Sequence, residues 1–182
     1  MGITDASGHR VARYRDNPQP LERCLEVFLW LLTTRYLPAV LAAFGACEPT
    51  EPQLAAALSF HYNTGAIARA SWLKRFLGGD TEAARHALLE WCRPPEVLPR
   101  RRRERDLFFD ARWSGDGTVA VYEVVKPGYH PLRTQRVATG MVIEALLHAD
   151  TFETAGAQDA VLALPPNEQA LPPRNWFERL FD

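Results

Sequence analysis

The stretch from Leu58 to Asp80 constrains the fold more than any other part of the chain. Asn63-Thr64-Gly65 interrupts an apolar run with residues that tolerate the left-handed backbone of a helix end. Apolar residues then recur near helical spacing, at Ile67, Trp72 and Phe76. Gly78-Gly79 ends this second segment, and Asp80 can cap the helix that follows. The pattern predicts two helices that meet at a tight polar turn.

The segment from Leu21 to Phe44 is strongly apolar, so a membrane span has to be considered. Four charged residues and Pro38 interrupt it, and no uncharged segment of the necessary length remains. We therefore predict a buried central helix that is kinked near Pro38, without stable insertion into a membrane.

Three further helices are predicted around these segments. One begins after Thr50, which can act as its N-cap, and another covers Thr81 to Trp91. The third runs from Arg100 to Trp113, with its arginines facing water or ligand and its apolar residues facing the core, at Leu107, Phe108 and Phe109.

The composition changes at Ser114-Gly115-Asp116-Gly117. Residues 118–125 have strand propensity throughout, Lys126-Pro127-Gly128 predicts a turn, and residues 129–137 form a second candidate strand. For residues 142–148 the pattern does not distinguish helix from strand, and 176–181 is a short amphipathic piece. The sequence predicts a mainly α fold with a small C-terminal β-hairpin.

Residues 57–91 (ALSFHYNTGAIARASWLKRFLGGDTEAARHALLEW) and 97–109 (VLPRRRRERDLFF) carry a family resemblance. Their order of aromatic-Asn-x-Gly turn, Ser-x-Leu helix, Gly-Asp turn, Ala-rich helix ending in Trp and Arg-rich helix resembles the C-terminal lobe of phage-type lysozymes, glycoside hydrolase family 24. The resemblance implies a lysozyme-like helical domain over residues 21–113. Residues 1–20 would be an extended lead-in, a remnant of the β-hairpin lobe, and residues 114–182 a C-terminal extension.

The resemblance also implies a catalytic Glu followed by an Asp and a Thr, all before the central helix. Tyr14-Arg15-Asp16 can imitate the family's Tyr-x-Asp, which makes Asp16 a candidate second carboxylate, but Ser7 stands where the Glu is then expected. Alternatively, Gly2-Ile3-Thr4 is the end of the family's hairpin, and the Glu belongs upstream of Met1. We favour the second alignment and expect no catalytic residue, and no activity, in this chain as written.

The surviving lobe retains candidate substrate-binding residues. By resemblance, Asn63 lines the substrate cleft with Tyr62 beside it, and the Arg-rich helix with Arg101 and Arg102 borders it. An amide suits N-acetyl and hydroxyl groups, and an aromatic face suits a pyranose ring. The alternative for Asn63 is a helix-end residue without a ligand. Glu104 stands among arginines, which makes it a poor candidate for the catalytic acid.

The run from Arg100 to Arg105 has three interpretations: a solvated or ion-paired face, contact with anionic murein, or nucleic-acid binding. Aromatic residues do not interleave with it, and the formal net charge of the whole chain is −1. We expect peptidoglycan as the partner and no nucleic acid. A non-catalytic murein-binding or virion-associated module is the alternative to a hydrolase.

The three cysteines are widely spaced and the five histidines are not paired, so neither a disulfide frame nor a metal site is predicted. No cofactor is expected. The N-terminus lacks the pattern of a signal peptide, which predicts a cytoplasmic protein that acts on the cell wall once released. Apolar surface on the segment from Leu21 to Phe44 predicts self-association.

Overall fold

A computed structural model describes residues 12–15, 17, 19–115, 117–125, 130–138 and 140. These residues are mostly helical, with one two-stranded antiparallel sheet on the C-terminal side, which confirms the predicted fold class. They divide into two compact units, one of residues 30–114 and the other of the residues before 30 and after 114. The predicted domain boundaries at residues 20 and 113 stay a prediction.

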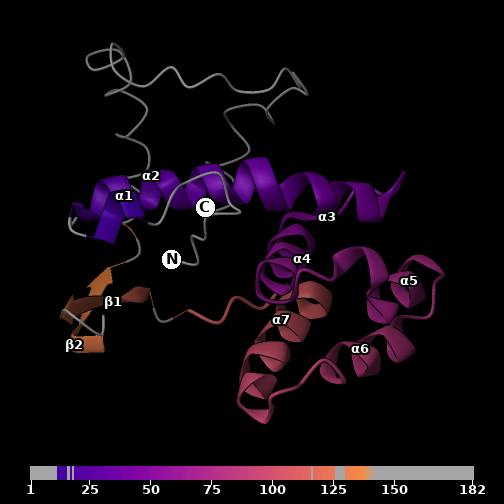
Figure 1. The fold of residues 1–182 in the computed structure, drawn as a ribbon. Helices are drawn as coiled ribbons and strands as arrows, with labels where there is room; N and C mark the ends of the chain where they lie inside the picture. Colours follow the sequence, from indigo (N-terminus) through magenta and orange to yellow (C-terminus); the bar gives the residue numbers. More distant parts are fainter. Residues whose placement is uncertain are drawn as a thin grey trace, which may run out of the picture. The chain divides into compact units, whose positions relative to one another are not determined.

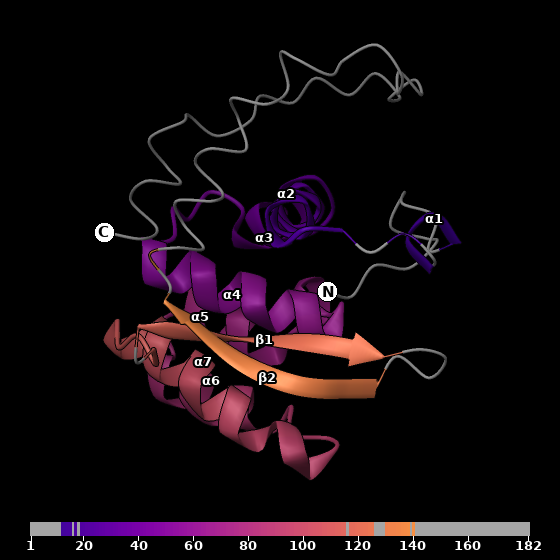
Figure 2. The same ribbon diagram turned by 90° about the vertical axis from the view of Figure 1, so that its left-hand side faces the viewer.

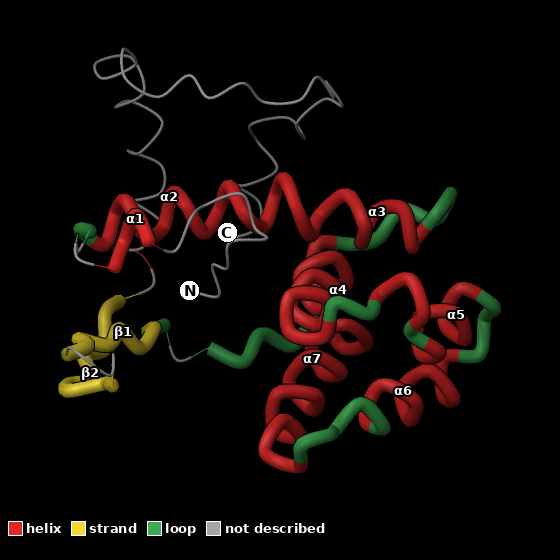
Figure 3. Tube along the Cα trace, viewed as in Figure 1, coloured by secondary structure: helices red, strands yellow, loops and turns green. Residues whose placement is uncertain are grey.

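Residues 30–114 form a helical lobe. Its helices are α3 (Leu37–Phe44), α4 (Glu51–Thr64), α5 (Ser71–Leu77), α6 (Thr81–Leu89) and α7 (Leu98–Asp110). Helices α4 and α7 pack along each other, and α5 pairs with α6 (Figure 1). Figure 3 shows that, within the described residues, all of the strand structure lies outside this lobe.

The core of the lobe is aromatic. Phe60 from α4, Trp72 from α5 and Phe108 from α7 are at most 2% exposed. Their rings meet edge to face, with centroids 5.3 Å apart for Phe60 and Trp72 and 5.0 Å apart for Trp72 and Phe108. Edge-to-face pairs add to the free energy of burial. The apolar stripe predicted from the spacing of Trp72 therefore does face the interior.

The apolar segment from Leu21 to Phe44 forms one long helical run. It begins with α2 (Leu21–Leu31), passes through a π-helical turn (Leu32–Tyr36) and continues as α3 (Figure 1). Pro38 cannot donate the usual backbone hydrogen bond and crowds the preceding turn, so an irregularity is expected there. The hydroxyl groups of Thr33 and Thr34 both donate to the carbonyl of Trp30, at 3.1 and 2.7 Å.

By length and composition alone, the helical run from Arg23 to Phe44 is apolar enough to cross a membrane. The core helix of a soluble protein passes the same test. In its last part, Leu37, Val40 and Phe44 are buried in the aromatic core of the lobe. These three side chains have the environment predicted for a central core helix.

Two local predictions differ from the structure. Helix α4 ends at Gly65, whose φ of 64° is left-handed as expected, but the next helix does not start at Ile67. A single 3₁₀ turn (Ile67–Arg69) comes first, and Ala70 then adopts an extended backbone before α5 begins. In the segment expected to be extended, Ala12–Arg15 form one helical turn, α1. By contrast, Asp80 caps α6 as predicted, accepting from the N–H of Ala83 at 3.1 Å.

The sheet is a hairpin of β1 (Thr118–Val125) and β2 (His130–Ala138), shown in Figure 2. Thr118 lies opposite Ala138, and the register shifts between Glu123 and Val124. This agrees with the two predicted strands to within one residue at each end. The predictions for residues 142–148 and 176–181 lie outside the described residues.

Candidate functional site

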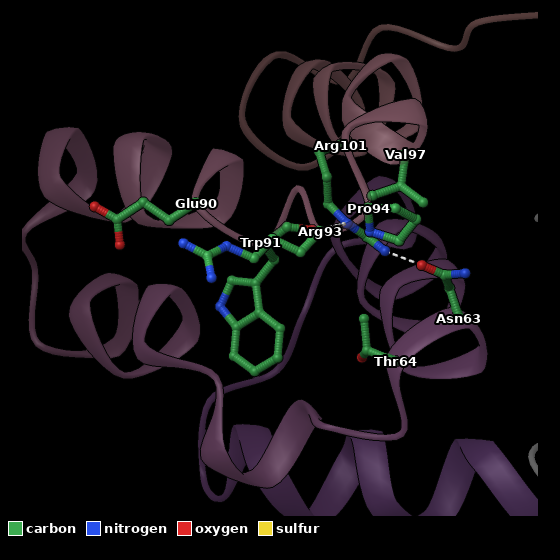
Figure 4. A pocket seen from close by; sticks show the side chains of 8 residues that line it. All are labelled: Asn63, Thr64, Glu90, Trp91, Arg93, Pro94, Val97 and Arg101. Atoms are coloured by element: carbon green, nitrogen blue, oxygen red, sulfur yellow. Dashed lines mark hydrogen bonds between the residues drawn. The ribbon is translucent and has the colours of Figure 1, made fainter.

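The helical lobe carries a pocket of about 470 Å³ where the ends of three helices meet (Figure 4). The end of α4, the residues that follow α6 and the start of α7 contribute its lining, which consists of Asn63, Thr64, Glu90, Trp91, Arg93, Pro94, Val97 and Arg101. The lining combines an aromatic ring, an amide, a carboxylate and two guanidinium groups. Such a surface can contact the ring of a ligand and its polar substituents together.

A buried ion pair lies beneath the pocket. Arg101 is 0% exposed and Glu104 is 4% exposed, although both belong to the most charged run of the chain. Arg101 Nη1 is paired with Glu104 Oε2, and Arg101 Nε donates to the carbonyl of Trp91 at 3.1 Å. The guanidinium group also lies over the Phe60 ring, with its central carbon 4.9 Å from the ring centroid, which is a cation–π contact.

Glu104 is fully engaged as an acceptor. Its Oε1 accepts from Ser59 Oγ at 2.7 Å and from Arg100 Nε at 3.0 Å, and its Oε2 faces Arg101. Arg100 also donates to the carbonyl of Ser59 at 3.1 Å. Both arginines lie one helical turn before the carboxylate, at positions 100 and 101 against Glu104. The sequence therefore contained the spacing that predicts these ion pairs. The partner Ser59, on another helix, could not be read from it.

The predicted substrate-binding residues Asn63, Arg101, Arg102 and Tyr62 occupy different environments. Asn63 is exposed at the pocket, and its Oδ1 accepts from Arg101 Nη2. Arg101 is buried and also lines the pocket, whereas Arg102 is exposed on α7 and outside the pocket lining. Tyr62 is half-buried against Tyr36, with ring centroids 5.1 Å apart, and is not a lining residue. The structure thus brings Asn63 and Arg101 together at the pocket.

Sequence analysis did not single out Trp91 and Arg93 as binding residues. Both follow α6 and line the pocket opposite the end of α4. The signal that could have found them is the Arg93-Pro94-Pro95 sequence, because two prolines after α6 mark a loop beside the helix end, in which Pro94 is extended and Pro95 begins a 3₁₀ turn.

A family model for phage lysozyme matches residues 9–105. The chain belongs to the phage lysozyme family. The matched range covers more than half of the chain and contains every residue that lines the pocket. No curated protein and no solved structure matches the chain. Lysozymes are glycosidases that hydrolyse peptidoglycan, so membership of the phage lysozyme family gives the class of reaction.

Two acids of the helical lobe, Glu104 and Asp110, are held in ion pairs. Glu104 is occupied as described, and Asp110 is bound by Arg85, with Nη1 donating to Oδ2 at 3.1 Å. The hydrogen bond from Arg85 lowers the pKa of Asp110 to about 2. Glu90 is the one carboxylate among the pocket-lining residues that the structure describes. Asp16, the candidate second carboxylate, lies outside the described residues.

His61 stands one turn before the end of α4. Its Nδ1 accepts from the N–H of Ile67 at 3.4 Å, and its ring meets Tyr36 edge on, with centroids 5.5 Å apart. Burial lowers the pKa of His61, which favours the neutral ring that this acceptor role requires. The histidine therefore supports the turn that carries Asn63.

The cysteines and candidate metal ligands of the described residues do not form a site. Cys24, Cys47 and Cys92 form no disulfide among these residues, and Cys47 is exposed. Among the described residues, no group of three His, Cys, Asp or Glu side chains is close enough to hold a metal ion.

Proposed function

We propose that this chain is a member of glycoside hydrolase family 24, whose reaction is hydrolysis of the bond between N-acetylmuramic acid and N-acetylglucosamine, and that the chain as written binds peptidoglycan without cleaving it. The observation that carries the proposal is the pocket beside Asn63, because all of its lining falls within the range matched to phage lysozyme. In this proposal, residues 30–114 supply the wall of the cleft that holds the glycan.

The lining chemistry fits a murein glycan. The exposed amide of Asn63 offers hydrogen bonds to acetamido and hydroxyl groups, and the Trp91 ring offers an apolar surface to a pyranose. Arg93 supplies positive charge for the lactyl or peptide carboxylates of murein. Asn63 comes from the end of α4, whereas Trp91 and Arg93 follow α6, so the folded lobe is required to present the three groups together.

Glycoside hydrolysis usually needs two carboxyl groups on either side of the scissile bond. The described pocket offers Glu90 alone, and the acceptor sites of Glu104 are occupied by Ser59 and two arginines. We therefore expect the described residues to bind murein without cleaving it, with any catalytic carboxyl groups coming from outside them. A non-catalytic murein-binding or virion-associated module remains the alternative and shares the same pocket.

Two measurements test the proposal. In a turbidity assay on purified peptidoglycan, we expect the 182-residue chain to give no clearing, and clear lysis would refute the expected inactivity. In a pull-down on insoluble peptidoglycan, we expect retention of the wild type and loss of retention after Asn63→Ala combined with Arg93→Ala, since both residues line the pocket. Arg133→Ala, on the exposed hairpin, is the matched control and should be retained. Unchanged retention of the double variant would remove the pocket from the model.

A further inference from the structure

We propose that Arg101 is a positioning residue that fixes the direction of the Asn63 amide, so that the pocket presents N–H donors and selects N-acetylated over de-N-acetylated sugars. The inference rests on the proposed function, because it concerns the same pocket and a glycan ligand. It assigns to the buried Arg101 a role that acts through Asn63 rather than through contact with the ligand.

The first step is the direction of the amide. A guanidinium group can only donate hydrogen bonds, so the atom of Asn63 that faces Arg101 has to be the amide oxygen. The Oδ1 atom of Asn63 does accept from Arg101 Nη2, and the amide nitrogen is turned away from the guanidinium group (Figure 4). Within the described residues, this nitrogen donates no hydrogen bond. The amide nitrogen of Asn63 can therefore donate two hydrogen bonds to a ligand, whereas its oxygen is bound to Arg101.

The second step is the rigidity of the donor. Arg101 is 0% exposed and is held at three further points, by the Glu104 carboxylate, the Trp91 carbonyl and the Phe60 ring. Turning the guanidinium group away from Asn63 would take a donor from Oε2 of the buried Glu104 carboxylate or from the Trp91 carbonyl, which is costly. The amide is thus held by a group that cannot turn away, and a half-turn of the amide would place its N–H groups against those of Arg101.

The third step is the choice of ligand. Outward N–H donors match the carbonyl oxygen of an acetamido group. A de-N-acetylated sugar carries an ammonium group in the same place, which is itself only a donor. Arg93, which also lines the pocket, adds a like charge against that ammonium group. The pocket should therefore bind an N-acetylglucosamine oligomer and disfavour the corresponding glucosamine oligomer.

The experiment measures binding of the N-acetylglucosamine trimer and of the glucosamine trimer to the full chain by calorimetry, at a mildly acidic pH where the glucosamine amines are protonated. Neither probe carries a carboxylate, so contacts to lactyl or peptide groups do not contribute. We expect the wild type to prefer the acetylated trimer by about ten-fold, the change typical for one hydrogen bond. Equal affinities would overturn this inference while leaving the proposed function intact, whereas binding of neither trimer would overturn both.

Asn63→Asp is the decisive variant because it preserves the shape of the side chain. The new carboxylate still accepts from Arg101, so the buried network is kept, but the outward group becomes an acceptor. We expect the preference to invert, with weaker binding of the acetylated trimer and stronger binding of the glucosamine trimer. A preference equal to that of the wild type would overturn the inference.

Arg101→Lys tests the positioning role itself. A lysine can remain paired with Glu104, but its single ammonium group lacks the planar fork that reaches Glu104, Asn63 and the Trp91 carbonyl together. We expect the amide of Asn63 to turn freely and the ratio of the two affinities to fall towards one. A merely structural role for Arg101 would lower both affinities and leave their ratio unchanged, and that outcome would overturn the assignment. Should the variant not fold, Asn63→Asp still decides the question.

Discussion

The helical lobe of residues 30–114 and the hairpin of residues 118–138 differ in how their side chains are fixed. The lobe buries aromatic rings and an ion pair, and its polar groups contact partners far away in the sequence. In the hairpin, the described side chains are exposed or half-buried, with Tyr122 56% exposed and Leu132 57% exposed. A two-stranded hairpin is marginal on its own. Of these two described regions, the lobe is the one with the packing that a preorganised binding site requires.

The largest expected effect is on the aromatic core. Phe108→Ala should lower the free energy of unfolding by about 4 kcal/mol, because Phe108 contacts Phe44, Trp72 and Phe76 and leaves a cavity between them. Tyr122→Ala, in the hairpin, should change it by no more than about 0.5 kcal/mol. Urea unfolding followed by tryptophan fluorescence measures both. Similar losses for the two variants would contradict the difference between the regions.

The buried ion pair should give the next largest effect. Glu104→Gln removes the negative charge and leaves Arg101 as an uncompensated buried cation, which should cost about 3 kcal/mol. Glu123→Gln, on the exposed face of β1, is the matched control and should be near neutral. Replacing both members of the buried pair, with Arg101→Met and Glu104→Leu, should recover most of the loss. A loss that is as large in the double variant would show that the charge imbalance is not the cause.

A smaller effect is expected at the turn that carries Asn63. Gly65 has a φ of 64° with open space around its α-carbon, so Gly65→Ala meets no neighbouring atom and only the left-handed backbone opposes it. This should cost about 1 kcal/mol. Gly115→Ala, before the hairpin, introduces no left-handed strain and should be neutral. Thermal unfolding of the two variants distinguishes backbone strain from a general intolerance of added methyl groups.

The smallest effect should be the pH dependence of the surface pair between Arg85 and Asp110. The pKa of Asp110 is lowered from 3.8 to about 2 by the hydrogen bond from Arg85, so the pair stabilises the folded state above the unfolded pKa. This stabilisation is lost as the pH falls from about 4 to 2. Asp110→Asn should flatten this part of the stability profile, and added salt should weaken the contribution in the wild type. An unchanged acid limb in Asp110→Asn would contradict the assignment.

Local patterns in the sequence predicted local structure well. The spacing of Trp72 identified a buried stripe, Gly65 the end of α4, and Asp80 the cap of α6, because each signal depends on residues within one or two turns. The break at Ala70 was missed, since alanine is a strong helix former and only the surrounding packing excludes it from the helix.

The candidate site was predictable in part. The resemblance pointed to Asn63. The burial of Arg101 involves contacts to Asn63 and Phe60, which belong to a different helix. The sequence alone does not show these contacts, so the run of arginines could equally be a solvated face. Trp91 and Arg93 belong to the site because the loop after α6 lies beside the end of α4, which is a tertiary contact. The sequence did not reveal those side chains whose role in the site depends on how two helix ends pack against each other.

The buried ion pair between Arg101 and Glu104 also lowers the number of arginines in α7 that can bind a polyanion, and so affects the salt dependence of such binding. Of the five arginines in α7, Arg100, Arg101 and Arg105 contact carboxylates within the described part of the chain, which leaves Arg102 and Arg103 exposed. Each arginine that neutralises a phosphate releases about 0.9 counterions. If this helix binds DNA, the logarithm of the binding constant should therefore fall with the logarithm of the salt concentration with a slope of about −2, the value expected for two cations. No detectable DNA binding at low salt would eliminate DNA as a ligand.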